Sequence, residues 1–156
     1  MDDGRLALLV PLGFGVLFVG LWVGIFQVLA RMGGWRELAR AYPPLAIVGS
    51  AGETFRMRSA QLRRGVNYNG CITFVAGPAA LRLSLPRILA FGHPPIEIPW
   101  AEISSEASRS FWIALVTLRC ARASPSVPLR LGRRLAESLA RASGGQLRLP
   151  AAETAR

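Results

Sequence analysis

Lysine is absent from this chain, and all nineteen basic residues are arginine. The absence excludes a lysine Schiff base, a lysine nucleophile and the lysine of a phosphate-binding loop. Histidine occurs only as His93, so a multi-histidine zinc site cannot form, and its proline neighbours favour a rigid structural turn. The two cysteines, Cys71 and Cys120, are far apart and belong to no CxxC pair. We therefore expect no metal ion and no other cofactor.

Acidic side chains are also scarce. Aspartate occurs only as Asp2 and Asp3, and the glutamates show no spacing that specifies a general acid and a general base. The chain also lacks the GxSxG sequence that carries a nucleophilic serine in many hydrolases. The sequence therefore predicts a protein that is not an enzyme.

The most prominent feature is an uncharged run from Leu6 to Ala30, preceded by a short tail, residues 1–5. A helix over this run would extend roughly 37 Å, enough to cross a hydrocarbon core of about 30 Å. A cleaved signal peptide is the competing interpretation, with a cleavage site near Ala30. Signal peptides have shorter apolar regions behind a positively charged start, whereas this run is long and its start is acidic. We expect an uncleaved transmembrane helix.

The charges beside this helix predict its orientation. Arg31, Arg36 and Arg40 follow it directly, whereas the tail before it carries a net negative charge. Arginines next to a membrane span are retained on the cytoplasmic side. We expect the N-terminus outside and the following domain in the cytoplasm, where thiols stay reduced. A disulfide between Cys71 and Cys120 would require the reverse orientation, with the domain outside the cytoplasm.

Three glycines, Gly13, Gly20 and Gly24, fall on one face of the expected transmembrane helix. Small residues on one face let two helix backbones approach closely. This face predicts helix packing, either in a homodimer or against a membrane protein partner. The alternative is that glycine is simply tolerated there, as it is in many membrane helices.

Residues 31–54 are expected to form a short amphipathic helix followed by a proline-initiated linker. The apolar positions of this helix repeat at helical spacing: Trp35, Leu38, Ala39 and Tyr42. In one interpretation the helix lies in the headgroup layer, with Trp35 at the interface and Arg36 and Arg40 facing anionic lipid. In the other it packs against its own domain. The sequence does not decide between them.

Residues 55–143 change to period-two patterning and predict six to eight short antiparallel strands, followed by an amphipathic helix over residues 131–143. On the first strand we expect Phe55 and Met57 to face the core, and a hairpin turn at Asn69-Gly70. Trp100 is expected to be a core anchor. A loose tail, residues 144–156, would end the chain.

The segment Ile96-Glu-Ile-Pro-Trp100-Ala-Glu-Ile103, together with a small antiparallel barrel and one C-terminal helix, resembles pleckstrin-homology (PH) and GRAM-like domains. Asn67-Tyr68, Leu81-Arg-Leu-Ser84 and Gly92-His-Pro-Pro95 are similar to parts of an uncharacterised bacterial membrane-protein family of this plan. The resemblance implies a single-pass protein of the bacterial inner membrane with a mainly-β (α+β), PH/GRAM-like domain. It implies no site residue and no activity.

The arginines supply the remaining functional expectation. Because Arg56 and Arg58 should point away from the core, they would form one basic face with Arg63 and Arg64. Such a face suits membrane lipids with anionic headgroups, an acidic protein partner, or solubility alone. Nucleic acid is disfavoured because no binding motif accompanies the charge. The sequence thus predicts a membrane-anchored binding domain, and as the alternative a structural subunit of a larger membrane complex with the transmembrane helix as its interface.

Overall fold

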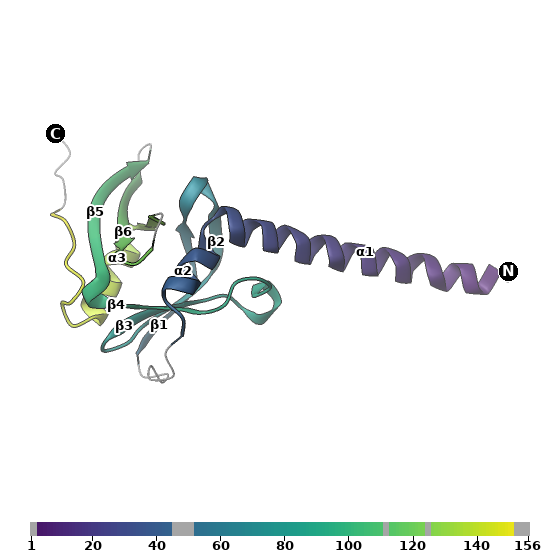
Figure 1. Ribbon diagram of the computed structural model, residues 1–156, viewed down its shortest axis with the longest axis horizontal. Coiled ribbons are helices and arrows are strands. Elements are labelled where there is room, and N and C mark those ends of the chain that lie inside the picture. Colours follow the sequence, from purple (N-terminus) through teal and green to yellow (C-terminus); the bar gives the residue numbers. More distant parts are fainter. Residues whose placement is uncertain (1–2, 45–51, 111–112, 124–125, 152–156) are drawn as a thin grey trace.

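The computed structural model describes residues 3–44, 52–110, 113–123 and 126–151, with backbone alone for residues 3–8, Arg64 and Ser110. A long helix, α1 (Asp3–Met32), projects from a β-domain (Figure 1). The domain is a seven-stranded antiparallel sheet in the order β4-β3-β2-β1-β7-β6-β5, curled into a half-barrel. Its strands are β1 (Glu53–Gln61), β2 (Asn67–Ala76), β3 (Ala80–Ser84), β4 (Ile96–Pro99), β5 (Ile103–Ser110), β6 (Ile113–Cys120) and β7 (Leu129–Gly132).

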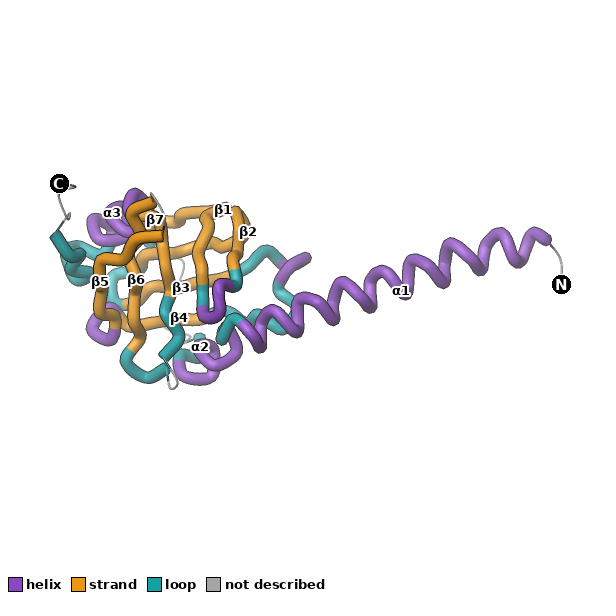
Figure 2. The backbone as a smooth tube through the Cα atoms, turned by 90° about the horizontal axis from the view of Figure 1, so that it is seen from above, coloured by secondary structure: helices purple, strands orange, loops and turns teal. Residues whose placement is uncertain are grey.

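The segment Leu9–Met32 of α1 is long and apolar enough to cross a membrane, with a mean hydropathy of 2.3. Most of its large apolar side chains are exposed, because the β-domain covers only the last turns. Ala30 is already fully buried in the domain core. The helix is therefore an apolar rod that is continuous with the folded domain at its C-terminal end (Figure 2).

The expected mainly-β domain with short antiparallel strands and a C-terminal helix is confirmed, although the sheet does not close into the expected barrel. Alternating side chains face the core because successive residues of a strand point to opposite faces, as at Ile72 and Phe74 in β2 and at Ile96 and Ile98 in β4. The sheet has two edges, β4 and β5, which are joined in sequence by the short 3₁₀ helix η3 (Trp100–Glu102). The domain is thus a curled sheet rather than a closed barrel.

Strand β1 departs from the simple alternation that its sequence predicts. Phe55 is buried as expected, but Met57 is 67% exposed and has a φ of +53°. The pairing with β2 shifts between Phe55 and Arg58, so β1 contains an extra residue at this point. A β-bulge of this kind turns the following side chains to other directions. The expectation that Met57 faces the core is therefore wrong.

The turn between β1 and β2 lies earlier than expected. Asn69 and Gly70 are inside β2, where Gly70 has a φ of +61° and its N–H donates to the Ser59 hydroxyl over 2.8 Å. The chain reverses instead at the 3₁₀ helix η1 (Arg63–Gly65). Gly70 therefore lies at a second register shift in the β1–β2 pairing and not in a hairpin turn.

Helix α2 (Trp35–Ala41) folds back onto the β-domain. Trp35 and Leu38 are fully buried, and Tyr42 just after the helix is nearly so. Gly34 makes this path available because its φ is +81° and an added Cβ would lie 2.9 Å from Val127. The helix packs against its own domain, so the interpretation that places Trp35 in the headgroup layer is not the one the structure supports.

The core also extends beyond the C-terminal helix α3 (Arg133–Ala142). Gly144 and Gly145, with φ of +65° and +83°, end this helix as expected. Leu147 is buried, and the Gln146 side-chain amide donates to the Pro78 carbonyl over 2.6 Å. The first residues of the expected loose tail are thus packed onto the domain, whose core includes residues on both sides of the range 55–143.

Candidate functional site

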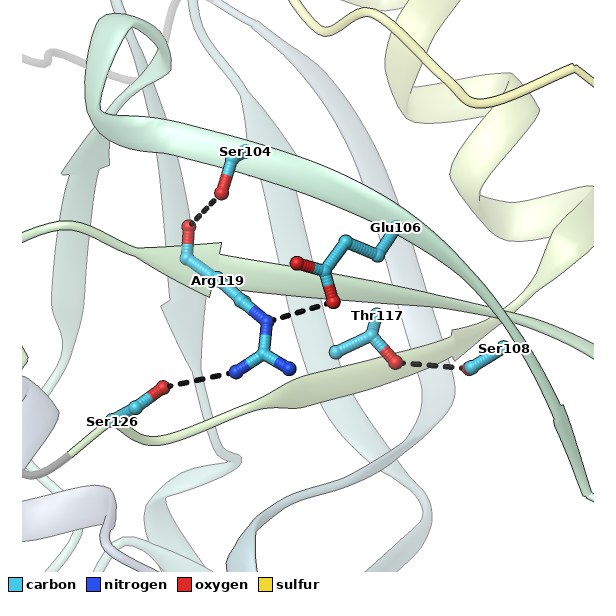
Figure 3. A network of polar contacts seen from close by, with 6 residues as sticks. All are labelled: Ser104, Glu106, Ser108, Thr117, Arg119 and Ser126. Carbon is cyan, nitrogen blue, oxygen red and sulfur yellow. Dashed lines mark hydrogen bonds and ion pairs between the residues drawn. The ribbon is translucent and has the colours of Figure 1, made fainter.

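Many arginines of the domain are already engaged by glutamates. Figure 3 shows one case on the outer face of β5 and β6, where Arg119 donates to Glu106 over 2.8 Å and Thr117 donates to Ser108 over 2.9 Å. Similar ion pairs join Arg63 to Glu37, Arg82 to Glu97, Arg122 to Glu102 and Arg133 to Glu137. Because the charge of each of these arginines is already balanced by a glutamate, they are poor candidates for binding an external anion.

Among the four arginines that were expected to form one basic face, two are exposed on a strand and a third is engaged by a glutamate. Arg56 and Arg58 are exposed on β1, next to the bulge. Arg63 lies at the β1–β2 turn and is paired with Glu37 of α2, and the side chain of Arg64 lies outside the described residues. A basic face made of all four arginines therefore stays a prediction, and Arg63 is the member whose charge is already balanced.

A different basic group lies where α1 meets α2. Arg31 comes from the last turn of α1, and Arg36 and Arg40 are neighbours on α2 at a spacing of four residues. Together with Glu37 they line a surface hollow of about 340 Å³, which we call the juxtamembrane arginine hollow. Arg36 and Arg40 were candidates from the sequence, whereas Arg31 was considered only for orientation.

The charge of this hollow is strongly unbalanced. Its one carboxylate, Glu37, is engaged by Arg63, so four arginines face one glutamate. In the part of the chain that the structure describes, no carboxylate pairs with Arg31, Arg36 or Arg40. A guanidinium group presents a planar set of N–H donors that suits phosphate oxygens. The hollow can therefore receive an anionic group of phosphate size at the end of the apolar helix.

Behind the hollow, a buried aromatic cluster joins α2 to the sheet and to the loop before β4. Trp35 donates its indole N–H to the Pro94 carbonyl over 2.8 Å and packs against the rings of Tyr68 and His93. His93 Nδ1 is 3.0 Å from the Phe91 carbonyl, which can only accept, so Nδ1 carries the proton. His93 Nε2 then accepts from the Tyr68 hydroxyl over 2.8 Å. Both ring nitrogens hold the domain together, in agreement with a structural His93.

Acidification should destabilise the domain through this histidine. Burial lowers the pKa of His93 below its usual 6.5, and burial raises the pKa of its neighbour Tyr68, which stays protonated. Below about pH 6.5 the unfolded chain therefore binds more protons than the folded one. As the pH is lowered through this range, the free energy of unfolding decreases by up to about 1.4 kcal/mol per pH unit. We expect a lower melting temperature at pH 5 than at pH 7.

Thermal unfolding of the full chain in detergent micelles measures this effect, and His93→Gln provides the control because the chain has no other histidine. The variant should be less stable at pH 7 but should lose much less of its remaining stability by pH 5. A wild-type melting temperature that is the same at both pH values would contradict the assigned role of the buried ring.

The two thiols are separate and free in the structure. Burial raises the pKa of Cys120 to about 12, and it also raises the pKa of Cys71. Both groups are therefore held in the protonated, weakly reactive form. Among the described residues, no three histidine, cysteine or acidic side chains gather into a group that would hold a metal ion.

The glycine face of α1 is uncovered. A Cβ added at Gly13, Gly20 or Gly24 would meet no atom within 4 Å. The opposite side of the helix carries an aromatic ladder that runs down to the domain: Phe14, Phe18, Trp22 and Phe26. Helix packing through the glycines stays a prediction.

Comparisons of the chain with family models, with curated proteins and with solved structures find no match. The PH/GRAM-like resemblance therefore stays a prediction beside the observed half-barrel.

Proposed function

We propose that this protein is a single-pass protein of the bacterial inner membrane whose cytoplasmic, PH/GRAM-like domain binds anionic phospholipid headgroups. The binding site is the juxtamembrane arginine hollow. The observation that carries the proposal is the position of three unbalanced positive charges directly at the end of an apolar helix long enough to span a membrane. Headgroup phosphates of the adjacent leaflet lie at that level.

The junction between α1 and the domain favours a retained anchor over a cleaved signal sequence. Ala30, which would precede the cleavage site, is fully buried in the core. The ring of Phe26 also contacts His93, with centroids 6.1 Å apart. Cleavage after Ala30 would remove both groups from the folded domain. The last turns of α1 therefore belong to the domain, which supports membrane anchoring of the intact chain.

Weak contacts between the arginines of the hollow and lipid headgroups are enough for binding at this position. Each arginine near an anionic membrane surface contributes about 1 kcal/mol, so three contribute about 3 kcal/mol. The anchor also keeps the hollow at the membrane surface, where the effective headgroup concentration is high. An acidic protein partner would be attracted by the same charges. Lipid is favoured because the headgroup layer is the first anionic surface beside the helix end.

Removing charge from the hollow should abolish lipid preference. We expect Arg36→Gln with Arg40→Gln to lower the affinity for phosphatidylglycerol roughly 30-fold, which corresponds to about 2 kcal/mol. The full chain is transferred into mild detergent from vesicles of equal phosphatidylglycerol and phosphatidylcholine. Native mass spectrometry then counts the lipids that stay bound.

The matched control removes the same charge elsewhere. Arg134→Gln with Arg141→Gln changes two arginines on α3, at the end of the domain away from α1 (Figure 2). This variant should keep the wild-type preference for phosphatidylglycerol. Equal losses in both double variants would show that the arginines act as a general charge, and a wild type without preference would refute headgroup binding.

Orientation is tested separately. Because Arg31, Arg36 and Arg40 follow the span directly, we expect the β-domain to stay on the cytoplasmic side. A tag fused to the C-terminus should resist protease added to the outside of spheroplasts and should be digested once the membrane is opened. Digestion of the tag in intact spheroplasts would overturn the cytoplasmic assignment.

A further inference from the structure

The loop between β3 and β4, residues 85–95, exposes large apolar side chains at an unexpected place. Ile88 is 70% exposed and Phe91 is 46% exposed, although Leu85 in the same loop is buried. Both views of the molecule show this loop reaching back alongside the last turns of α1 (Figures 1 and 2). The exposed apolar residues therefore lie beside the apolar helix rather than at a distant corner of the domain.

Two contacts place this loop at the depth of the membrane helix. A Cβ added at Gly92 would lie 3.4 Å from the Gln27 side-chain oxygen, and His93 contacts the ring of Phe26. Gln27 precedes the end of α1 at Met32 by five residues, which is about 7.5 Å of helix. The loop therefore lies level with the last turns of the apolar segment and not beyond its end.

The loop is built in a way that tolerates a membrane interface. Its backbone groups bond internally, with the N–H of Leu89 donating to the Pro86 carbonyl over 2.8 Å and the N–H of His93 to the Ala90 carbonyl over 2.9 Å. Internal hydrogen bonds lower the cost of placing a loop where water is scarce. Residues 85–95 contain no acidic side chain and one basic residue, Arg87. A loop of this composition can lie between the headgroups and the acyl chains of a membrane.

We propose that the β3–β4 loop inserts Ile88 and Phe91 into the interfacial region of the leaflet in which α1 ends. The inference rests on the anchoring part of the proposed function and adds a second, apolar contact with the membrane. The occupant of this surface is lipid, because the loop contacts the last turns of α1, an uncharged apolar segment that the proposed function places in the membrane. Together, helix and loop fix the tilt of the domain and hold the juxtamembrane arginine hollow toward the headgroups.

The insertion is tested by depth-dependent quenching on the full chain in nanodiscs of phosphatidylcholine alone. Ile88→Cys carries an environment-sensitive fluorophore, in a chain whose native cysteines are replaced (Cys71→Ser and Cys120→Ala). Met57→Cys is the matched control, because Met57 is nearly as exposed, at 67%, but lies on β1. Leu17→Cys, in the middle of α1, reports the span itself.

We expect strong quenching at position 88 by lipids with a nitroxide high on the acyl chain, and little quenching at position 57. The label at position 17 should be quenched most by nitroxides near the bilayer centre. Quenching at 88 no greater than at 57, with position 17 still quenched, would overturn loop insertion while leaving the anchor intact. Because these discs contain no anionic lipid, the result does not depend on headgroup binding by the hollow, and it should persist at high salt.

Discussion

Trp35→Ala is expected to lower the free energy of unfolding of the domain by about 3–5 kcal/mol. The indole is fully buried, packs against Tyr68 and His93, and donates to the Pro94 carbonyl. Its loss would leave a cavity between α2, β2 and the β3–β4 loop and would leave that carbonyl without its partner. A small domain has a total stability of about 5–15 kcal/mol, so this loss is a large part of it.

Chemical unfolding of the full chain in micelles, followed by circular dichroism of the sheet, measures the effect of Trp35→Ala. The free energy of unfolding of Trp35→Phe should lie between those of Trp35→Ala and the wild type. Phenylalanine restores most of the ring packing but not the indole N–H. If Trp35 lay in the headgroup layer instead, the alanine variant would unfold like the wild type and would differ only in its contact with lipid.

Trp100→Ala should lower the free energy of unfolding by a similar amount, about 3–5 kcal/mol. Trp100 is buried, and its indole N–H donates to the Gly77 carbonyl over 2.9 Å. Its backbone N–H also donates to the Ala79 carbonyl over 3.1 Å, so the residue connects η3 to the β2–β3 turn. The sequence predicted this core position from its apolar neighbours, and the structure confirms it.

A third tryptophan provides the control for Trp100→Ala. Trp22 lies on α1, ten residues before the end of the helix at Met32, is 40% exposed and is not part of the buried core cluster of the described residues. Trp22→Ala makes the same chemical change without touching the core, so the unfolding of the β-domain should be nearly unchanged. A Trp100→Ala domain as stable as Trp22→Ala would show that the indole does not hold the turn.

The main features of the fold could be predicted from local patterns. In β2 the alternation arises because every second side chain from Ile72 onward is buried, and this signal is complete within the strand. The bulge at Met57 and the position of Gly70 could not be predicted, because both depend on how β1 pairs with β2. A glycine after asparagine suits either a hairpin turn or a bulge, and only the register distinguishes them.

The candidate site was predictable only in part. An amphipathic helix with an aromatic stripe has the same pattern at a membrane interface as on a protein core, so the sequence left both interpretations of Trp35 open. The structure decides between them through the Gly33–Gly34 turn, where Gly34 approaches Val127 too closely for a side chain. The pairing of Arg63 with Glu37 joins residues that are distant in sequence, and this pairing determines which arginines stay unbalanced.

The central claim, that the juxtamembrane arginine hollow faces anionic headgroups, is tested most directly by photo-crosslinking. The full chain is reconstituted in nanodiscs with phosphatidylglycerol that carries a photoreactive group on its headgroup, and crosslinked peptides are mapped by mass spectrometry. We predict that crosslinks concentrate in residues 31–41, decrease at high salt, and are much weaker with the corresponding phosphatidylcholine probe. Crosslinks in residues 31–41 that are no more frequent than those in α3, or that are equal for the two lipids, would contradict the account.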